Sequence, residues 1–277
     1  MSEIWEAIQT NFVIILMVTA RVSGIFTFNP IFSRNGVPNM VKAGASLMLA
    51  LVMAAAGDFS YPIPQGVLPF ALDIGKELLV GFTLGFFVNL MLQLFSLAGE
   101  LSDYQIGLSM ARSYDPTFGT TSLVTQYYSW WFMIYFFMVG GHLSYIKLFF
   151  ISYESIPMGF SSFNFNVGLL IVKYFETVLT LGLKLAMPVI AAGLVTEFCI
   201  GVLMKAVPSI HVFVLNVQIK MLVGFVVLAG CSSMVSEFME KIMDLLFSNL
   251  NTLLGETLKG WEDGRRRKNR KSHPEKA

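Results

Sequence analysis

Charged side chains inside apolar runs are the first residues of this sequence that could do chemistry. They are Arg21, Glu176, Lys184, Glu197 and Lys220. A charge at the centre of a lipid-facing helix costs about 2.5–3.5 kcal/mol on insertion scales, so several such charges imply protein or water neighbours rather than lipid. Three roles fit them: ion pairs inside a helix bundle, a proton relay, or contacts with other subunits. Pairing or subunit packing is favoured over the relay.

Histidines and cysteines give no recognisable catalytic centre. His142, His211 and His273 stand apart, and the sequence contains no GxSxG, HExxH or P-loop pattern. Cys199 and Cys231 both lie in apolar runs, where a buried thiol behaves as a small hydrophobic group. We therefore expect no disulfide, metal or other cofactor, and no enzyme.

A segment of mixed character, LSDYQIGLSMARSYDPTFGTTS (101–122), lies between two strongly apolar stretches. Asp115-Pro116 and Gly119 interrupt helical order, because proline restricts the residue before it. The segment also carries the bulky side chains Ile106, Leu108, Met110, Tyr114 and Phe118. Non-helical backbone at membrane depth is tolerated only inside protein or along a water-filled cavity. The residues alone predict either a re-entrant, pore-facing loop or an ordinary cytoplasmic turn with one amphipathic helix.

Apolar helices must position these residues. The 277 residues are 55% hydrophobic and 13% charged, whereas about a quarter of the residues in soluble domains are charged. With a mean hydropathy of +0.66, this is the composition of an integral membrane protein. A span needs about 20 apolar residues. The candidate helices are Phe12–Phe32, Val41–Ala56, Val67–Ala98, Tyr127–Ile151, Val167–Val195 and His211–Ser233, with Thr196–Val207 joining the last two.

A seventh helix of different character is expected beyond Ser233. Its apolar residues recur at helical spacing, at Val235, Phe238, Ile242, Leu245, Leu246, Leu250 and Leu253. This pattern predicts an amphipathic helix that lies on the membrane surface or packs against a partner subunit. After Gly260 the chain is polar and basic, with RRRKNRK at 265–271, and we expect a disordered tail over 261–277.

The orientation signals of an all-α chain with six spans conflict. Basic residues favour the cytoplasm, so Arg34 and Lys42 place the first loop inside, and Asp58 places the second outside. Six spans in this order leave the tail outside, although RRRKNRK is the strongest cytoplasmic signal in the chain. Either one span is miscounted, or some apolar helices do not cross the bilayer.

The sequence resembles one known family in several places. AGELSDYQIGLSMARSYDP (98–116) is similar to the signature of the FliR family of flagellar export-gate subunits and its virulence-secretion relatives. ARVSGIFTFNPIFSRNGVPNMVKAG (20–44), FMVGGHLSYIKLFFISYESIPMG (137–159) and CIGVLMKAVPSIHVFVLNVQIKMLVG (199–224) resemble further parts of that family in the same order. The resemblance extends from Ile4 to Leu258, and no family pattern matches the basic tail.

The resemblance implies a noncatalytic subunit of the flagellar type III protein export channel. Such a subunit joins P and Q components in single copy, in the bacterial inner membrane at the flagellar basal body. A B component lies at the cytoplasmic entrance, and unfolded flagellar proteins are the substrates. The apolar helices are then hairpins packed on neighbouring subunits and lipid, not a conventional polytopic bundle. One domain covers 1–260, with a P-like part to about 165 and a Q-like hairpin part over 166–260.

In the resembled family, the loop that matches 106–122 plugs the central pore. The residues carried over to this role are Ile106, Gly107, Leu108, Met110, Arg112, Tyr114, Asp115, Pro116, Phe118 and Gly119. Bulky apolar side chains can close a constriction by excluding water. Gly107, Gly119 and the Asp115-Pro116 turn are the expected hinges, since gates come from the less stable parts of a structure. Arg112 and Asp115 either latch the closed state or remain solvated.

Two other functions compete with this expectation. A secondary transporter for a small solute would explain intramembrane charges and broken helices, but it predicts inverted repeats, and the sequence shows no internal repeat. A membrane hydrolase would need a nucleophile beside a base, which the sequence does not offer. We expect no nucleic-acid partner. The choice between a flagellar and a virulence system stays open at this stage.

Overall fold

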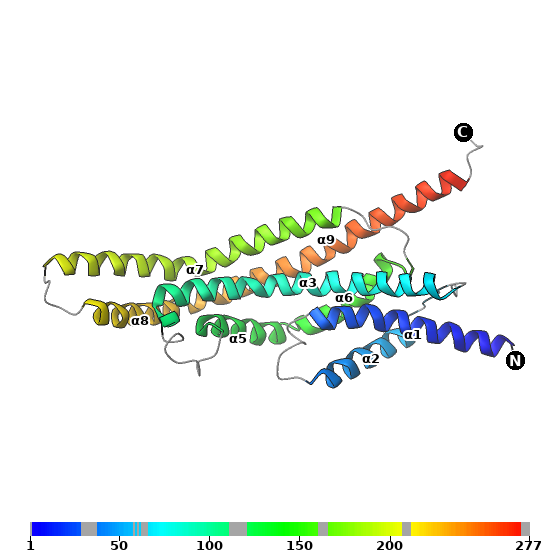
Figure 1. Cartoon of the computed structure of the whole chain (residues 1–277), viewed down its shortest axis with the longest axis horizontal. Helices are drawn as coiled ribbons and strands as arrows, with labels where there is room; N and C mark the ends of the chain where they lie inside the picture. The colour runs from blue at the N-terminus through cyan, green and yellow to red at the C-terminus, as the bar shows by residue number, and fades with distance from the viewer. Residues whose placement is uncertain are drawn as a thin grey trace. The chain divides into compact units, whose positions relative to one another are not determined.

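The computed structural model describes residues 2–28, 38–57, 59, 61, 66–110, 121–159, 166–206 and 212–272. Within these ranges the regular secondary structure is helical throughout, which confirms the all-α prediction (Figure 1). The helices are α1 (Ser2–Phe28), α2 (Asn39–Ala56), α3 (Val67–Ile106), α5 (Leu123–Met138), α6 (Gly141–Ser155), α7 (Asn166–Ala206), α8 (Val212–Gly230) and α9 (Ser232–Ser272).

Several helix boundaries differ from the sequence prediction. α1 begins at Ser2 rather than at Phe12, and α3 ends at Ile106 rather than at Ala98. The single helix predicted over Tyr127–Ile151 is two helices, because Gly140 adopts a φ of +73° at the break between α5 and α6. Glycine enters this left-handed region without the steric cost that a Cβ imposes. Conversely, Thr196–Val207 was predicted as a junction, but α7 continues unbroken to Ala206. Glu197 and Lys205 are polar, but neither residue type breaks a helix. Ending the helix at Val195 because polar residues follow was therefore wrong.

The chain divides into two compact units. One contains residues 1–89, 140–173 and 246–277, and the other contains 90–139 and 174–245. Each unit therefore draws on both halves of the chain, and α3, α7 and α9 contribute residues to both. The division at about residue 165, which separates a P-like part from a Q-like part, was inferred from the family resemblance and stays a prediction.

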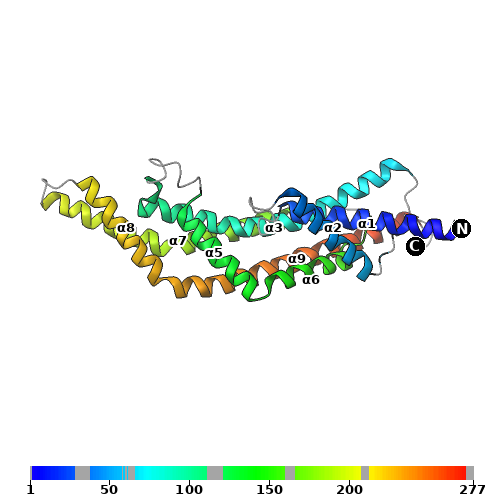
Figure 2. The same ribbon diagram turned by 90° about the horizontal axis from the view of Figure 1, so that it is seen from below.

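In the first unit, α1 lies beside α2 and packs tightly against the beginning of α3 (Figures 1 and 2). A Cβ added at Gly24 of α1 would lie 2.7 Å from the backbone oxygen of Leu78. A Cβ at Gly81 of α3 would overlap the backbone of Arg21. Small residues let helix backbones approach closely, and the two glycines make α1 and α3 a matched pair.

In the second unit, α7 and α8 form a hairpin whose glycines face α3. A Cβ at Gly182 would lie 2.9 Å from the side chain of Leu97, and Cβ atoms at Gly193 and Gly224 would overlap Gln105 and Ile106. Glycine at these positions lets the last turns of α3 pack directly on the hairpin. The hairpin architecture expected from the family resemblance is therefore present.

The apolar face of α9 is buried inside the chain itself. Val235, Ile242, Leu246, Leu250 and Leu253 of the predicted stripe are buried, and Met239 and Met243 join them. The predicted amphipathic helix is confirmed. Over these residues its apolar face packs against other helices of the same chain, and not against the membrane surface or a partner subunit as the sequence predicted. The helix extends to Ser272, beyond the residue at which the sequence predicted a disordered tail.

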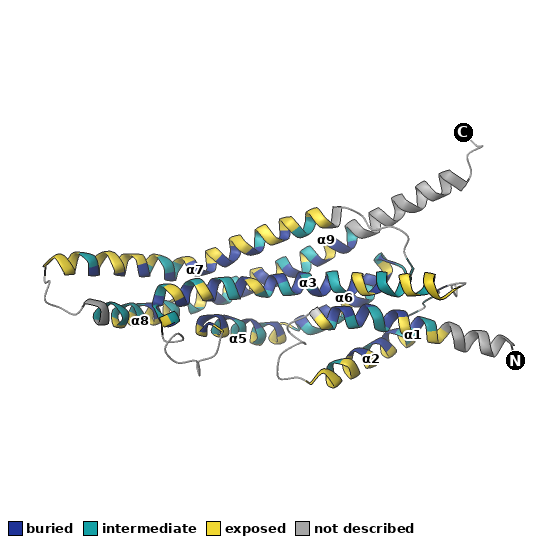
Figure 3. Cartoon of the chain, in the orientation of Figure 1, coloured by how far each residue is buried: buried dark blue, intermediate teal, exposed yellow. Residues whose placement is uncertain are grey.

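Much of the remaining apolar surface is exposed. Among the described residues, α2, α3 and Gly168–Ala206 of α7 are long and apolar enough to cross a membrane, and two broken pairs, α5 with α6 and α8 with α9, would raise the count to five. Figure 3 shows exposed residues along the length of α7, and they include Phe198 at 74% and Val195 at 63%. Side chains of this kind are placed in lipid or against other subunits rather than in water.

Candidate functional site

The predicted pore-facing loop begins and ends at well-defined helix termini. Ile106 and Leu108 are buried, and Met110 is exposed. Between them, Gly107 adopts a φ of +90° and donates its N–H to the carbonyl oxygen of Asp103 at 3.0 Å. This glycine ends α3, because the left-handed conformation cannot continue a helix. The other loop residues of the prediction, Arg112, Tyr114, Asp115, Pro116, Phe118 and Gly119, lie outside the described residues.

Asp103 joins the two ends of this segment. Its side chain is fully buried, and its two carboxylate oxygens accept the N–H groups of Leu123 at 3.0 Å and Val124 at 3.2 Å. The Oγ of Ser122 accepts the N–H of Thr125 at 3.0 Å. The first N–H groups of a helix have no partner within it, and a negative charge is favourable there. Asp103 and Ser122 therefore cap α5 together.

Close backbone packing stabilises the same junction. A Cβ at Gly99 would overlap the backbone of Thr125, so only glycine lets α3 approach α5 this closely. The Oγ1 of Thr125 donates to the carbonyl oxygen of Ser96 at 3.3 Å. Three hydrogen bonds, two to Asp103 and one to Ser96, and the close backbone approach at Gly99 therefore hold α5 against α3.

A cavity lies beside these helix ends. It has a volume of about 370 Å³ and is lined by Leu108, Leu123, Val124, Tyr127, Phe225, Leu228 and Ala229. All lining residues except Tyr127 are aliphatic or phenyl, so the cavity suits an apolar group and not a charged substrate. No acid, thiol or imidazole stands among the lining residues to act on a bound molecule.

Arg21 forms the second polar centre, in the first unit. Its Nε donates to Glu77 at 2.6 Å, and both side chains are fully buried. Its other nitrogens donate to the carbonyl oxygens of Ser152 at 3.0 Å and Ile156 at 2.9 Å, and its guanidinium lies 3.7 Å from the centre of the Tyr153 ring. One side chain from α1 therefore binds α3 and closes the C-terminal end of α6.

Three further side chains, Tyr61, Asp73 and Lys76, form a polar group near this centre. Tyr61 donates its hydroxyl to Asp73 at 2.6 Å, and Lys76 donates to the other oxygen of Asp73 at 2.7 Å. Burial, followed by the hydrogen bond to Asp73, raises the pKa of Tyr61 above its ordinary value. The phenol is therefore a neutral donor that ties the segment before α3 to the helix.

The other predicted charges lie on the hairpin of α7 and α8. Glu197 and Lys220 bind each other across the hairpin, with the Glu197 side chain 46% exposed. Glu176 and Lys184 are exposed on α7, and neither forms an ion pair within the described part of the chain. The five charges thus divide into Arg21, which binds inside its own chain, one interhelical pair and two exposed groups.

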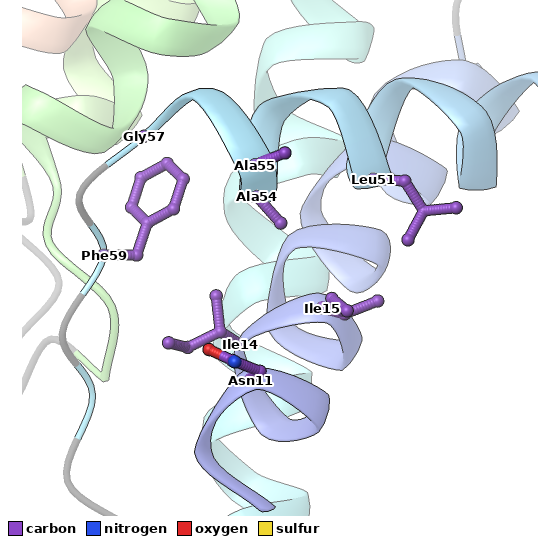
Figure 4. Close-up of a pocket in the computed structure, with 8 residues that line it drawn as sticks. All are labelled: Asn11, Ile14, Ile15, Leu51, Ala54, Ala55, Gly57 and Phe59. Atoms are coloured by element: carbon purple, nitrogen blue, oxygen red, sulfur yellow. The ribbon is translucent and has the colours of Figure 1, made fainter. Parts of the chain in front are cut away.

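A pocket of about 420 Å³ lies in the first unit, between α1 and α2 (Figure 4). Figure 4 shows Asn11, Ile14 and Ile15 of α1 on one side and Leu51, Ala54 and Ala55 of α2 on the other, with the Phe59 ring beside Gly57. Asn11 carries the only polar side chain among these lining residues. One amide offers no general acid, base or nucleophile, so the pocket does not indicate catalysis.

The described residues hold no group of three or more His, Cys, Asp or Glu side chains placed to bind a metal ion. Cys199 and Cys231 are both free. Cys199 is exposed on α7 and Cys231 is half-buried, so the expectation that both thiols are buried was wrong. The apolar run around Cys199 is an outward-facing surface, which sequence hydropathy cannot separate from a core.

Comparison with known proteins identifies the family. The model of the family described as bacterial export proteins, family 1, matches residues 12–246. The chain belongs to this family. The family is one of export proteins, and together with the long apolar helices it makes this chain a membrane-embedded export protein.

Curated relatives of this export protein carry two kinds of name. The flagellar biosynthetic protein FliR of Bacillus subtilis (strain 168) is 26% identical over 245 residues, which cover 86% of this chain and 93% of the relative. FliR of Escherichia coli (strain K12) is 26% identical over 242 residues, covering 85% and 90%. The surface presentation of antigens protein SpaR of Shigella flexneri is 24% identical over 255 residues, covering 91% and 94%. The resemblance to the FliR family is confirmed.

Sequence reasoning missed two residues of this export protein that the structure makes central, Glu77 and Asp103. Each is an acid inside or beside an apolar run, the same signal that singled out Arg21. Glu77 pairs with a residue 56 positions away, and Asp103 binds backbone 20 positions away. The charge of each residue is evident from the sequence. Its binding partner could not be predicted, because it depends on which helices pack against each other.

Proposed function

We propose that this chain is a noncatalytic subunit of the flagellar type III protein export gate. The match of the export-protein family to residues 12–246 carries the proposal. Relatives named as flagellar biosynthetic proteins at 26% identity support the flagellar system over a virulence system. Exposed apolar faces on several long helices support a subunit that other chains and lipid cover.

In this proposal the subunit joins P and Q subunits in one copy, in the bacterial inner membrane at the flagellar basal body. A B subunit lies at the cytoplasmic entrance, and unfolded flagellar proteins pass through the assembled channel. Glu176, Lys184 and the Glu197–Lys220 pair lie on the exposed hairpin and are proposed to contact neighbouring subunits. Arg21 belongs to the same proposed set, acting indirectly by holding α1, α3 and α6 in the arrangement that packs.

The segment 106–122 is proposed to plug the pore. One feature of the described residues and one feature of the sequence support a gate at this position. The segment leaves α3 at Gly107, whose positive φ makes a sharp turn, and it returns at the capped first turn of α5. Its side chains include Met110, Tyr114 and Phe118, which are bulky and apolar enough to exclude water from a constriction.

Replacing Gly107–Ser122 by a short flexible linker tests this proposal. The altered chain is purified in complex with P and Q subunits and inserted into planar bilayers, and its conductance to small ions is compared with that of the unaltered complex. We expect a steady leak, because a glycine-rich linker cannot exclude water. A conductance at background in a fully assembled complex would contradict the plug.

A further inference from the structure

The pocket between α1 and α2 in the first unit is formed by one face of each helix. Each helix contributes one residue and its neighbours three and four positions further along: Asn11, Ile14 and Ile15 of α1, and Leu51, Ala54 and Ala55 of α2 (Figure 4). Residues at this spacing share one side of a helix. The pocket therefore lies between two facing helix surfaces, and its volume of about 420 Å³ is in the range of small-molecule sites.

The pocket lies at the level where the apolar parts of both helices end. The apolar stretch of α1 is Asn11–Thr27, and the ten residues before it include two acids. α2 is apolar over its whole length and ends at Ala56. In a membrane-embedded chain, such a level corresponds to the boundary between the hydrocarbon and the lipid headgroups. The amide of Asn11 thus marks that boundary, and Ile15 and Leu51 lie one turn deeper, on the hydrocarbon side.

The wall of the pocket beyond the end of α2 is held by contacts that lead to Arg21. A Cβ at Gly57 would overlap the Phe59 ring, so glycine lets this ring lie directly against the chain. The centre of the Phe59 ring lies 5.0 Å from that of Tyr153, and the Tyr153 ring carries the guanidinium of Arg21 at 3.7 Å. Arg21 is in turn paired with Glu77. The pocket is therefore preformed, as most ligand sites are.

The lining favours an uncharged, mainly apolar molecule. Asn11 is the one lining residue with a polar side chain, and none of the eight is charged. A charged group would lose its hydration there without gaining a counter-ion. The pocket also adjoins the exposed apolar surface of α2, where Met48 is 71% exposed, and α2 is long and apolar enough to cross a membrane. Lipid hydrocarbon therefore reaches the pocket more readily than a water-soluble metabolite does.

We propose that this pocket binds one acyl chain of a membrane phospholipid. The hydrocarbon lies between Ile14 and Ile15 of α1 and Leu51 of α2, and the ester carbonyl oxygen accepts a hydrogen bond from the amide of Asn11. A lipid that binds only the folded chain stabilises it by mass action, so the bound acyl chain holds α1 and α2 together. The lipid site goes beyond the proposed function and does not depend on the pore plug.

Photolabelling in vesicles tests the site. The chain is purified with the subunits that accompany it and is reconstituted into phosphatidylethanolamine vesicles, in which a fraction of the lipid carries a diazirine on one acyl chain. Irradiation attaches this probe to residues within its reach, and mass spectrometry of the peptides locates them. We expect labelled residues on the pocket-lining turns of both α1 and α2.

The Ala54→Phe substitution places a ring in the pocket and should displace the acyl chain. We expect labelling of the lining residues to fall about tenfold, the factor that corresponds to losing about two buried methylene groups. Ala56→Phe is the matched control, because it makes the same change on an exposed residue of α2 that does not line the pocket. It should leave the labelling of the lining residues unchanged.

Three outcomes would overturn the proposal. The first is a label confined to exposed residues such as Met48, with none on the lining, and the second is equal labelling of the lining in Ala54→Phe and Ala56→Phe. If Ala54→Phe prevents purification, Asn11→Leu keeps the side-chain size and removes the amide. Labelling should then fall about fivefold, since one hydrogen bond is lost. The third outcome is unchanged labelling in Asn11→Leu, which would show that no lipid is held at this position.

Discussion

Two fully buried acids, Glu77 and Asp103, each bind groups from another helix. A carboxylate removed from water needs strong donors, and both obtain them from elements distant in sequence. Glu77 receives a guanidinium and Asp103 receives two backbone N–H groups at a helix start. Each acid therefore specifies which helices meet, whereas apolar side chains alone would allow several packings.

The Arg21–Glu77 pair leads to a prediction at this scale. Removing one partner by Arg21→Met or Glu77→Leu leaves an unpaired buried charge, and we expect each to lower the free energy of unfolding by about 3–5 kcal/mol. The double variant removes both charges and should recover part of this loss. Thermal unfolding of the purified complex in detergent measures these differences.

Lys147→Met is the matched control for those variants, because it removes an exposed charge from α6 at a residue outside the proposed subunit contacts. Its effect should stay within about 0.5 kcal/mol. A double variant as unstable as the sum of the two single variants would show that the pair does not couple. The loss would then come from the contacts of Arg21 with Ser152, Ile156 and Tyr153.

At the scale of helices, hydropathy located the elements but not their breaks. The run Tyr127–Ile151 reads as one span, yet Gly140 divides it, because GG can continue a helix or turn it and the sequence does not decide between them. The polar junction Thr196–Val207 reads as a connection, yet α7 passes through it. The break at Gly140 and the continuation of α7 both depend on which other helices pack against these residues. A short stretch of sequence does not contain that information.

At the candidate site, too, single residues could be predicted from the sequence, but contacts between distant residues could not. Gly107 was an expected hinge, and its positive φ is a property of one residue and its type. The role of Asp103 as a cap for α5 was not predictable, because the cap spans 20 positions and requires α3 and α5 to lie side by side. Arg21 was conspicuous as a cation in an apolar run, but its partner Glu77 was not.

Glycines at helix contacts give a prediction for α1 and α3. Gly81→Ala places a methyl group against the backbone of Arg21, which cannot yield as a flexible side chain does. We expect the two helices to separate and the complex to lose about 1–3 kcal/mol of stability.

Gly75→Ala is the matched control on the same helix, since nothing lies within 4 Å of its Cβ position. It should be neutral or stabilising by up to about 1 kcal/mol. Equal melting temperatures for the two variants would contradict close packing at Gly81.

At the scale of the whole molecule, burial is unevenly distributed. The apolar face of α9 is covered by the chain itself, whereas α2, α7 and α8 expose large apolar side chains such as Met48, Phe198 and Leu222. A soluble protein would not present so much apolar surface, and a self-contained transporter would bury charges such as Glu176 and Lys184. The pattern fits one subunit of a larger membrane assembly.

Native mass spectrometry after co-expression with P and Q subunits tests this interpretation directly. We expect one copy of this chain in a large hetero-oligomer, because its exposed helices differ from one another and each needs a different covering surface. Expressed alone in detergent, the chain should aggregate or degrade, since those surfaces then remain uncovered. A stable monomer or homodimer that does not associate with P and Q would contradict the export-gate assignment. It would instead direct attention to the interhelical Glu197–Lys220 pair and to Glu176 and Lys184 as charges of a transport site.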